Sequence, residues 1–186
     1  MEELLEQLLE DCRPYTAQGK LASYIPELLN ADPNALGIHI ITSDGKQSWA
    51  GDHTAKFTLQ STVKPILLLL ALMDNGIDYV RTRIGVEATG KPFDAINAGE
   101  QQLVSEHLNP MVNMGAIAMC TLIKGSDYKE RFQRLLELTR RLAGNNSIQV
   151  DEAVFQSEMS HGSKNRALAY MLKSYGLLEE IGRAHV

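Results

Sequence analysis

A serine and a lysine stand three residues apart at the start of an apolar run, in the order Ser61-Thr62-Val63-Lys64. Residues three apart lie on the same face of a helix, so a helical start here would place a hydroxyl beside an amine. A hydroxyl beside a potential base is the arrangement that an acyl-serine enzyme needs. The alternative is structural, because a serine at a helix start often accepts hydrogen bonds from backbone N–H groups.

The same spacing occurs twice more, at Ser43/Lys46 and at Ser126/Lys129. Ser43 is followed by Asp44-Gly45 between apolar runs, which is typical of a hairpin turn. Ser126 precedes a polar helical pattern, so we expect it to be a helix N-cap. Ser61 differs from both because the helix that follows it contains the continuous apolar run Ile66–Met73, which favours burial.

Three polar residues in the second half of the chain are further candidates for a binding site: Asn113, Glu158 and Asn165. Asn113 enters a helix of small residues, where its amide either caps the helix or binds a polar substrate. Glu158 and Asn165 are two helical turns apart, although Gly162 predicts a break between them. The Glu158 carboxylate either binds a substrate ammonium group or is a solvated charge, and Asn165 either binds substrate or is a cap. His161, next to Gly162, is expected to be a turn histidine rather than a base.

The pattern of apolar residues predicts the elements that position these side chains. Helices are expected at 1–13, 21–29, 62–75, 112–123, 128–142, 150–159 and 165–174, strands at 36–42, 47–50 and 57–60, and an irregular segment at 77–111. Helices, a short antiparallel β unit and then mainly helices indicate an α+β fold, with a small sheet backed by a helical subdomain. Two or three strands are few for a stable sheet, so further strands are expected from sequence outside this chain.

The length of 186 residues corresponds to a single domain, 1–186, and the net charge of −5 comes without a cluster of Lys and Arg. That charge argues against nucleic-acid binding. Cys12 and Cys120 make no metal-binding spacing and indicate free thiols in a reducing compartment. The acidic N-terminus does not resemble a signal peptide, and Ile66–Met73 is too short to span a bilayer. We therefore expect a soluble cytoplasmic protein.

Four segments in order resemble the glutaminases of the serine β-lactamase-like superfamily, the type common in bacteria. They are Gln60–Lys64, Gly85–Gly90, Asn109–Ala116 and Ser157–Tyr170, and residues 19–38 also look like that family. The resemblance implies that Ser61 is the nucleophile, that Lys64 is its base, and that Asn113, Glu158 and Asn165 contact L-glutamine. It implies hydrolysis of glutamine to glutamate and ammonia through an acyl-serine, with no cofactor or metal, in a homo-oligomer with a serine β-lactamase/transpeptidase-like fold.

Two departures from the family stand out. Pro65 directly follows the lysine where the family often has another residue, and proline is tolerated in a first helical turn, so we expect at most a shifted helix start. Family members are also much longer, and their remaining sequence supplies further strands, substrate-contacting tyrosines and an oxyanion-hole N–H. We therefore expect a chain lacking the C-terminal part, in which Gly182–Val186 looks like a frameshift product or a cloning scar.

Three functions remain open at this point. The first is a glutaminase. The second is an inactive, truncated glutaminase-like fragment that only binds substrate or associates with itself or a partner. The third is a β-lactam-binding acyl-serine protein, suggested by Ser61 and Lys64 alone, although Glu158 fits an amino-acid ammonium better.

Overall fold

The computed structural model describes residues 1–88, 90 and 108–178 of the chain. These residues belong to two compact units, Met1–Thr58 and Leu59–Val186. Each unit has a hydrophobic cluster of its own, so each is held together by its own apolar side chains.

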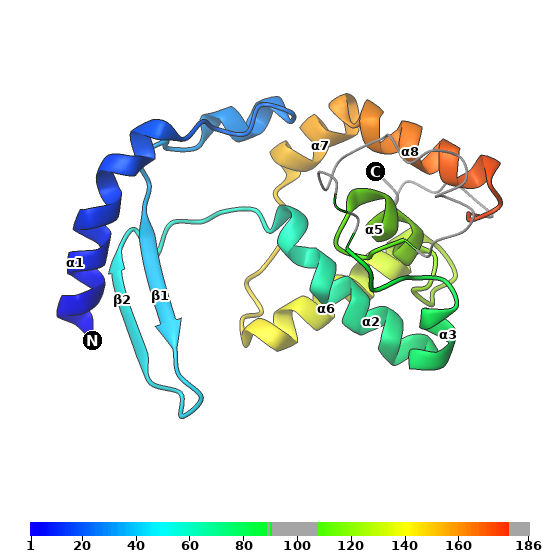
Figure 1. Ribbon diagram of the computed structural model, residues 1–186, viewed down its shortest axis with the longest axis horizontal. Coiled ribbons are helices and arrows are strands. Elements are labelled where there is room, and N and C mark those ends of the chain that lie inside the picture. The colour runs from blue at the N-terminus through cyan, green and yellow to red at the C-terminus, as the bar shows by residue number, and fades with distance from the viewer. Residues whose placement is uncertain (89, 91–107, 179–186) are drawn as a thin grey trace. The chain divides into compact units, whose positions relative to one another are not determined.

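The first unit is a β-hairpin with a helix on one face (Figure 1). Strands β1 (Gly37–Ile41) and β2 (Gln47–Gly51) pair antiparallel, with Ile38 opposite Ala50. Helix α1 (Glu2–Cys12) packs Leu5 and Leu9 against that face of the hairpin. The predicted helix at 1–13 and the predicted hairpin are thereby confirmed.

Two expectations for the first 60 residues are wrong. The predicted helix at 21–29 is only the short 3-10 helix η2 (Pro26–Asn30), and a second one, η1 (Arg13–Gln18), follows α1. The predicted strand at 57–60 does not form, because the backbone turns into a helical turn at Gln60 instead of extending. Phe57 is 83% exposed, so the apolar character of this segment does not reflect burial within the described residues.

The second unit is helical. Its described elements are η3 (Gln60–Val63), α2 (Lys64–Asn75), α3 (Ile77–Arg81), α5 (Asn113–Cys120), α6 (Tyr128–Ala143), α7 (Glu152–His161) and α8 (Ser163–Ser174). The predicted helices from residue 62 onward are confirmed. The expectation of an irregular segment at 77–111 is wrong at α3, and much of that segment lies outside the described residues.

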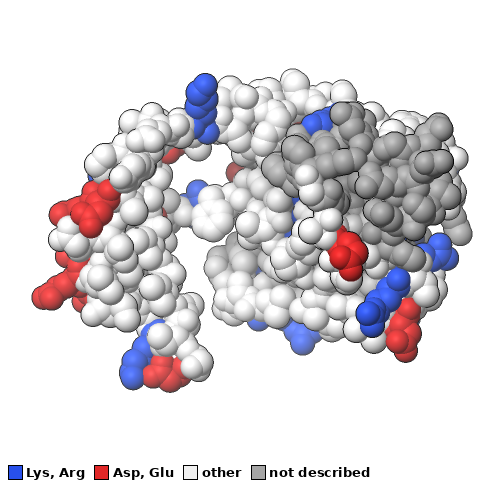
Figure 2. All heavy atoms as spheres, in the orientation of Figure 1, with Lys and Arg blue, Asp and Glu red and all other residues white. Residues whose placement is uncertain are grey.

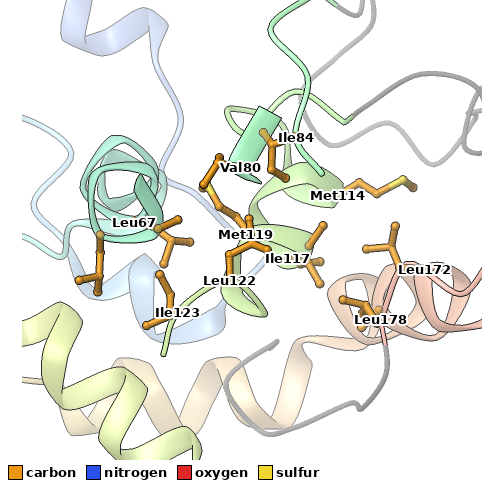
Figure 3. Packing of buried hydrophobic residues seen from close by; sticks show 14 of the residues in the cluster. Leu67, Val80, Ile84, Met114, Ile117, Met119, Leu122, Ile123, Leu172 and Leu178 are labelled. Carbon is orange, nitrogen blue, oxygen red and sulfur yellow. The ribbon is translucent and has the colours of Figure 1, made fainter. Parts of the chain in front are cut away.

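The core of this unit joins α2, α5 and α8 (Figure 3). Leu67 of α2, Ile117 of α5 and Leu172 of α8 all belong to one buried cluster. The first turns of these three helices carry three of the predicted site residues, so the core determines how those side chains are placed.

An ion pair joins α2 to α6. Arg134 Nη1 donates to Asp74 Oδ2 at 2.7 Å and also to the Lys124 carbonyl, while the Lys124 N–H donates to Asp74 Oδ2 at 2.8 Å. The Asp74 side chain is only 6% exposed and the Arg134 side chain 33%. The hydrogen bond from Arg134 lowers the pKa of Asp74, so the carboxylate stabilises the fold once it is ionised.

Replacing Asp74 by asparagine is expected to lower the free energy of unfolding by about 2–3 kcal/mol, because it leaves a half-buried guanidinium without its carboxylate. Since the pKa of Asp74 is lowered in the folded state, the wild-type advantage should disappear as the pH falls through that pKa. Urea unfolding at neutral and acidic pH measures both effects. Asp78→Asn, on the exposed side of α3, is the matched control and should change stability by less than about 0.5 kcal/mol.

The N-cap of α6 differs from the expectation. Asp127, not Ser126, is the cap, and its side chain accepts a hydrogen bond from the Glu130 N–H at 2.9 Å. Ser126 instead donates through its N–H and its hydroxyl to the Glu130 carboxylate. Ser43 lies in the hairpin turn as predicted, two residues before Gly45, which has φ of 83°.

Charged side chains are spread over the surface. On the face drawn in Figure 2, the described Lys and Arg side chains are scattered, and acidic side chains gather along α1. None of the helices in the described ranges has the length and hydropathy needed to cross a bilayer.

Candidate active site

Ser61 lies in the single 3-10 turn that leads into α2. The Lys64 N–H donates to the Ser61 carbonyl, so the two residues are joined across one helical turn. The caps of η3 and α2 are Leu59 and Val63, and neither makes a side-chain cap bond, so the interpretation of Ser61 as a helix cap is wrong. Pro65 sits in the first turn of α2, where it is tolerated as expected.

The residue before the serine has an unusual backbone conformation. Gln60 has φ of 46°, and it is the one residue other than glycine with positive φ among those the structure describes. Non-glycine residues in this region are uncommon and cluster at functional sites. The turn leaves Ser61 exposed, and within the described part of the chain its hydroxyl makes no hydrogen bond.

Lys64 is buried at the start of α2, with 7% of its surface exposed. Its Nζ donates to Asn113 Oδ1 at 2.8 Å and to the Met111 carbonyl at 3.1 Å. Burial lowers the pKa of Lys64 from its ordinary value, because the charged form loses hydration. A neutral amine has two N–H groups and one lone pair, and these two acceptors match its two N–H groups. In that neutral form, the nitrogen lone pair is the group that can accept a proton.

Asn113 is the first residue of α5 and connects two other site residues. The cap of α5 is Val112 without a side-chain bond, so Asn113 is not a helix cap. Its Oδ1 accepts from Lys64, and its Nδ2 approaches Asn165 Oδ1 at 3.4 Å. Asn165 lies in the first turn of α8 and is half-buried. Packing of α5 against α2 and α8 therefore brings together three residues that are up to about 100 positions apart in the sequence.

Glu158 lies in α7, and the predicted break at Gly162 separates it from Asn165 on α8. Arg166 Nη1 donates to the Met159 carbonyl at 2.8 Å, which holds the end of α7 against the first turn of α8. Glu158 is half-buried, and burial raises the pKa of its carboxyl. Within the described residues, its carboxylate has no hydrogen-bond or ion-pair partner. A half-buried carboxylate without a cation is suited to binding one.

His161 is the last residue of α7, and its Nδ1 lies 2.8 Å from the Ser157 carbonyl one turn earlier. The ring is exposed, and His161 ends a helix instead of lying in the turn that the sequence predicted.

The sequence reasoning missed one part of the site. The Met111 carbonyl contacts Lys64, and a backbone acceptor leaves no trace in residue type. A signal was present nearby, since Asn109-Pro110 is a turn-forming pair and directly precedes Met111.

Comparisons with known proteins show the family of the chain. A family model described as Glutaminase matches residues 19–185. This chain belongs to the glutaminase family. The family match includes residues 182–185, which we expected to lie outside the resemblance.

Curated glutaminases are similar over almost the whole chain. This chain is 50% identical over 179 residues to Glutaminase 2 of Clostridium perfringens and 47% identical over 180 residues to the glutaminase of Clostridium tetani. These alignments cover 96% and 97% of this chain but 59% of each relative. The chain thus spans about three-fifths of the length of these glutaminases.

A solved glutaminase from Bacillus subtilis has the same fold over this region. The two superpose with a TM-score of 0.85 at 33% identity, covering 99% of this chain and 56% of the other. That protein is a covalent complex with 5-oxo-L-norleucine, formed by its reaction with 6-diazo-5-oxo-L-norleucine. The α+β, serine β-lactamase-like fold expected from the sequence is confirmed, with a small antiparallel sheet and a helical part.

Proposed function

We propose that this chain carries a site for hydrolysis of the side-chain amide of L-glutamine, through an acyl-enzyme on Ser61. The observation that carries the proposal is the buried Lys64, one helical turn after an exposed serine, with acceptors for both N–H groups of its neutral amine. A serine is a weak nucleophile until a neighbouring base takes its proton. Burial lowers the pKa of Lys64, which favours its neutral, basic form.

In the first half of the proposed reaction, Ser61 Oγ attacks the amide carbon of glutamine while its proton passes to Lys64 Nζ. The C–N bond then breaks, and the leaving nitrogen takes the proton from Lys64 and departs as ammonia. In the second half, water attacks the ester carbon and gives a proton to Lys64. The ester bond breaks, Ser61 Oγ recovers the proton, and glutamate leaves.

Glu158, Asn113 and Asn165 are proposed to hold the amino-acid substrate. The half-buried Glu158 carboxylate is suited to the α-ammonium group. Asn113 uses its carbonyl oxygen for Lys64, so its amide NH₂ and the Asn165 side chain are the groups offered to the substrate carboxylate or amide.

The comparisons support this proposal because the matching family and the similar curated proteins are glutaminases. The reaction of the Bacillus subtilis protein with a diazo-ketone analogue of glutamine supports a nucleophile in the site. Because the chain spans 59% of the length of the curated relatives, the second candidate function is an inactive glutaminase-like fragment that binds substrate or associates with itself or a partner.

The family resemblance also leads us to propose that residues 1–186 are part of one glutaminase-like domain in a cytoplasmic homo-oligomer.

The test is reaction of the purified chain with 6-diazo-5-oxo-L-norleucine, followed by intact-mass measurement and peptide mapping. We expect one adduct, with loss of N₂, on the peptide containing Ser61, and ammonia release from glutamine but not from asparagine. Ser61→Ala should give neither result. Ser43→Ala, which removes the serine of the hairpin Ser-x-x-Lys, is the matched control and should behave like the wild type.

An adduct without ammonia release would support the acylation site but assign turnover to residues elsewhere. A chain that neither reacts nor releases ammonia would support the inactive-fragment alternative. A mass shift with penicillin instead would support the β-lactam-binding protein.

A further inference from the structure

The Met111 carbonyl that accepts a hydrogen bond from Lys64 belongs to a tightly constrained turn. Asn109 Oδ1 accepts from the Met111 N–H at 2.8 Å, and the Asn109 carbonyl accepts from the Val112 N–H at 3.2 Å. A side-chain amide that accepts from the backbone two residues later forms an Asx turn. Pro110 lies at the second position of the turn, where its ring restricts φ.

The other end of the Asn109 side chain anchors this turn to a separate segment. Asn109 Nδ2 donates to the Glu87 carbonyl at 2.9 Å. Next to it, the Gly85 N–H donates to the Leu108 carbonyl at 3.0 Å, within a parallel bridge between Ile84 and Leu108. Two hydrogen bonds therefore connect Asn109 and the residue before it to residues 85–87.

Helix α5 holds the turn from the other side. A Cβ atom added to Gly115 would lie 1.9 Å from the Asn109 carbonyl oxygen, so only glycine allows α5 to approach this closely. Asn113, two residues before Gly115 in α5, supplies another acceptor for Lys64. The Met111 carbonyl and Asn113 Oδ1, which both accept from Lys64, thus belong to one unit made of the turn and the start of α5.

We propose that Asn109 is a positioning residue for the lysine base, because its side chain holds the turn that presents the Met111 carbonyl to Lys64 Nζ. This inference rests on the proposed function, because Lys64 is a base only in that function. The hydrogen bonds of Asn109 do not depend on turnover. Asn109 acts through Lys64 and need not touch the substrate. Without Asn109, the Met111 carbonyl is no longer fixed, and the ammonium form of Lys64 loses a stabilising partner. The pKa of Lys64 should therefore fall, and the direction of its lone pair should become less defined.

The inference is tested by titrating the chain with ¹³Cε-labelled lysine by NMR, with the Lys64 signal assigned from Lys64→Met. Asn109→Ala is expected to lower the midpoint of Lys64 by about one pH unit. Asn109→Ser retains a side-chain oxygen that can form a weaker turn of the same kind. Its Lys64 midpoint should therefore lie closer to that of the wild type than the midpoint of Asn109→Ala does. It is also the variant to use if Asn109→Ala does not fold.

The matched control is Asn75→Ala. Asn75 Nδ2 donates to the Ala71 and Leu122 carbonyls at the far end of α2, so its loss costs comparable backbone contacts without reaching Lys64. Asn75→Ala should lower the melting temperature and leave the Lys64 midpoint unchanged. A midpoint in the folded Asn109 variants equal to that of the wild type overturns the inference.

The same variants are then compared for their rate of reaction with 6-diazo-5-oxo-L-norleucine against pH. Slower reaction, with its rising limb moved to lower pH in Asn109→Ala, supports the positioning role. Absence of an adduct in the wild type counts against the proposed function, whereas the NMR midpoint still decides the role of Asn109.

Discussion

Replacing Lys64 by arginine should slow acylation of Ser61 by about 10³-fold, close to the contribution expected of a general base. Arginine keeps the positive charge and can donate to the same acceptors, but its guanidinium does not lose a proton at any pH that proteins tolerate. The loss would therefore identify the lysine as a base rather than as a charge. The rate of adduct formation with 6-diazo-5-oxo-L-norleucine measures acylation directly.

Two further variants sharpen this result. Lys64→Met removes the amine but keeps an unbranched apolar side chain of similar length, so it should also be inactive while remaining folded. Lys129→Arg changes the exposed lysine of another Ser-x-x-Lys segment and should leave the rate unchanged. Reaction of Lys64→Arg within threefold of the wild type would falsify the role of Lys64 as a base.

The pH dependence follows from the same side chain. A base must be neutral to act, so the acylation rate should rise with pH through the pKa of Lys64. Burial lowers that pKa, so the rise should occur below the range of an exposed lysine.

Replacing Glu158 by glutamine should raise the KM for glutamine by about 10²-fold, because the substrate ammonium then enters a half-buried site without its counter-charge. In the proposed function, Glu158 binds the ammonium group as a carboxylate, and burial raises the pKa of this group. The wild-type KM should therefore increase as the pH falls through that raised pKa. Glu158→Gln should lack this increase, and steady-state kinetics across the acidic range measure it.

Stability should change in the opposite direction. A carboxyl whose folded-state pKa is raised costs stability when the pH exceeds its unfolded pKa, since folding then opposes ionisation. Glu158→Gln should accordingly melt at a higher temperature than the wild type at neutral pH while binding glutamine less well. Glu152→Gln, in the exposed first turn of the same helix, is the control for both measurements. Higher KM together with a lower melting temperature would indicate structural damage instead of a lost substrate contact.

Much of the helical framework was predictable because its signals are local. The apolar run before Asn75-Gly76 predicts α2, and the small residues after Asn113 predict α5. The Asp44-Gly45 pair predicts the hairpin turn that the structure contains. These features depend on residues a few positions apart, whose backbone preferences act within one turn or one strand pair.

The wrong predictions of strands and helix caps lie where tertiary contacts or neighbouring cap residues compete with the local backbone preference. The segment 57–60 has strand-like residues, yet Gln60 adopts a left-handed backbone and starts a helical turn. Ser126 and Asp127 are both good caps, and the structure selects Asp127 because Ser126 is already bound to Glu130. Sequence pattern cannot rank two such neighbours.

The sequence by itself determined the chemical groups and the spacing that joins Ser61 to Lys64, because one helical turn is a local property of the chain. It also determined membership of the glutaminase family, through motifs that stand in order along the chain. Only the tertiary structure decided the surroundings of the lysine. Burial of Lys64, its bonds to Asn113 and Met111, and the link to Asn165 all require α2, α5 and α8 to pack into one core. A lysine becomes a base through loss of water and placement of acceptors, and both come from residues distant in sequence.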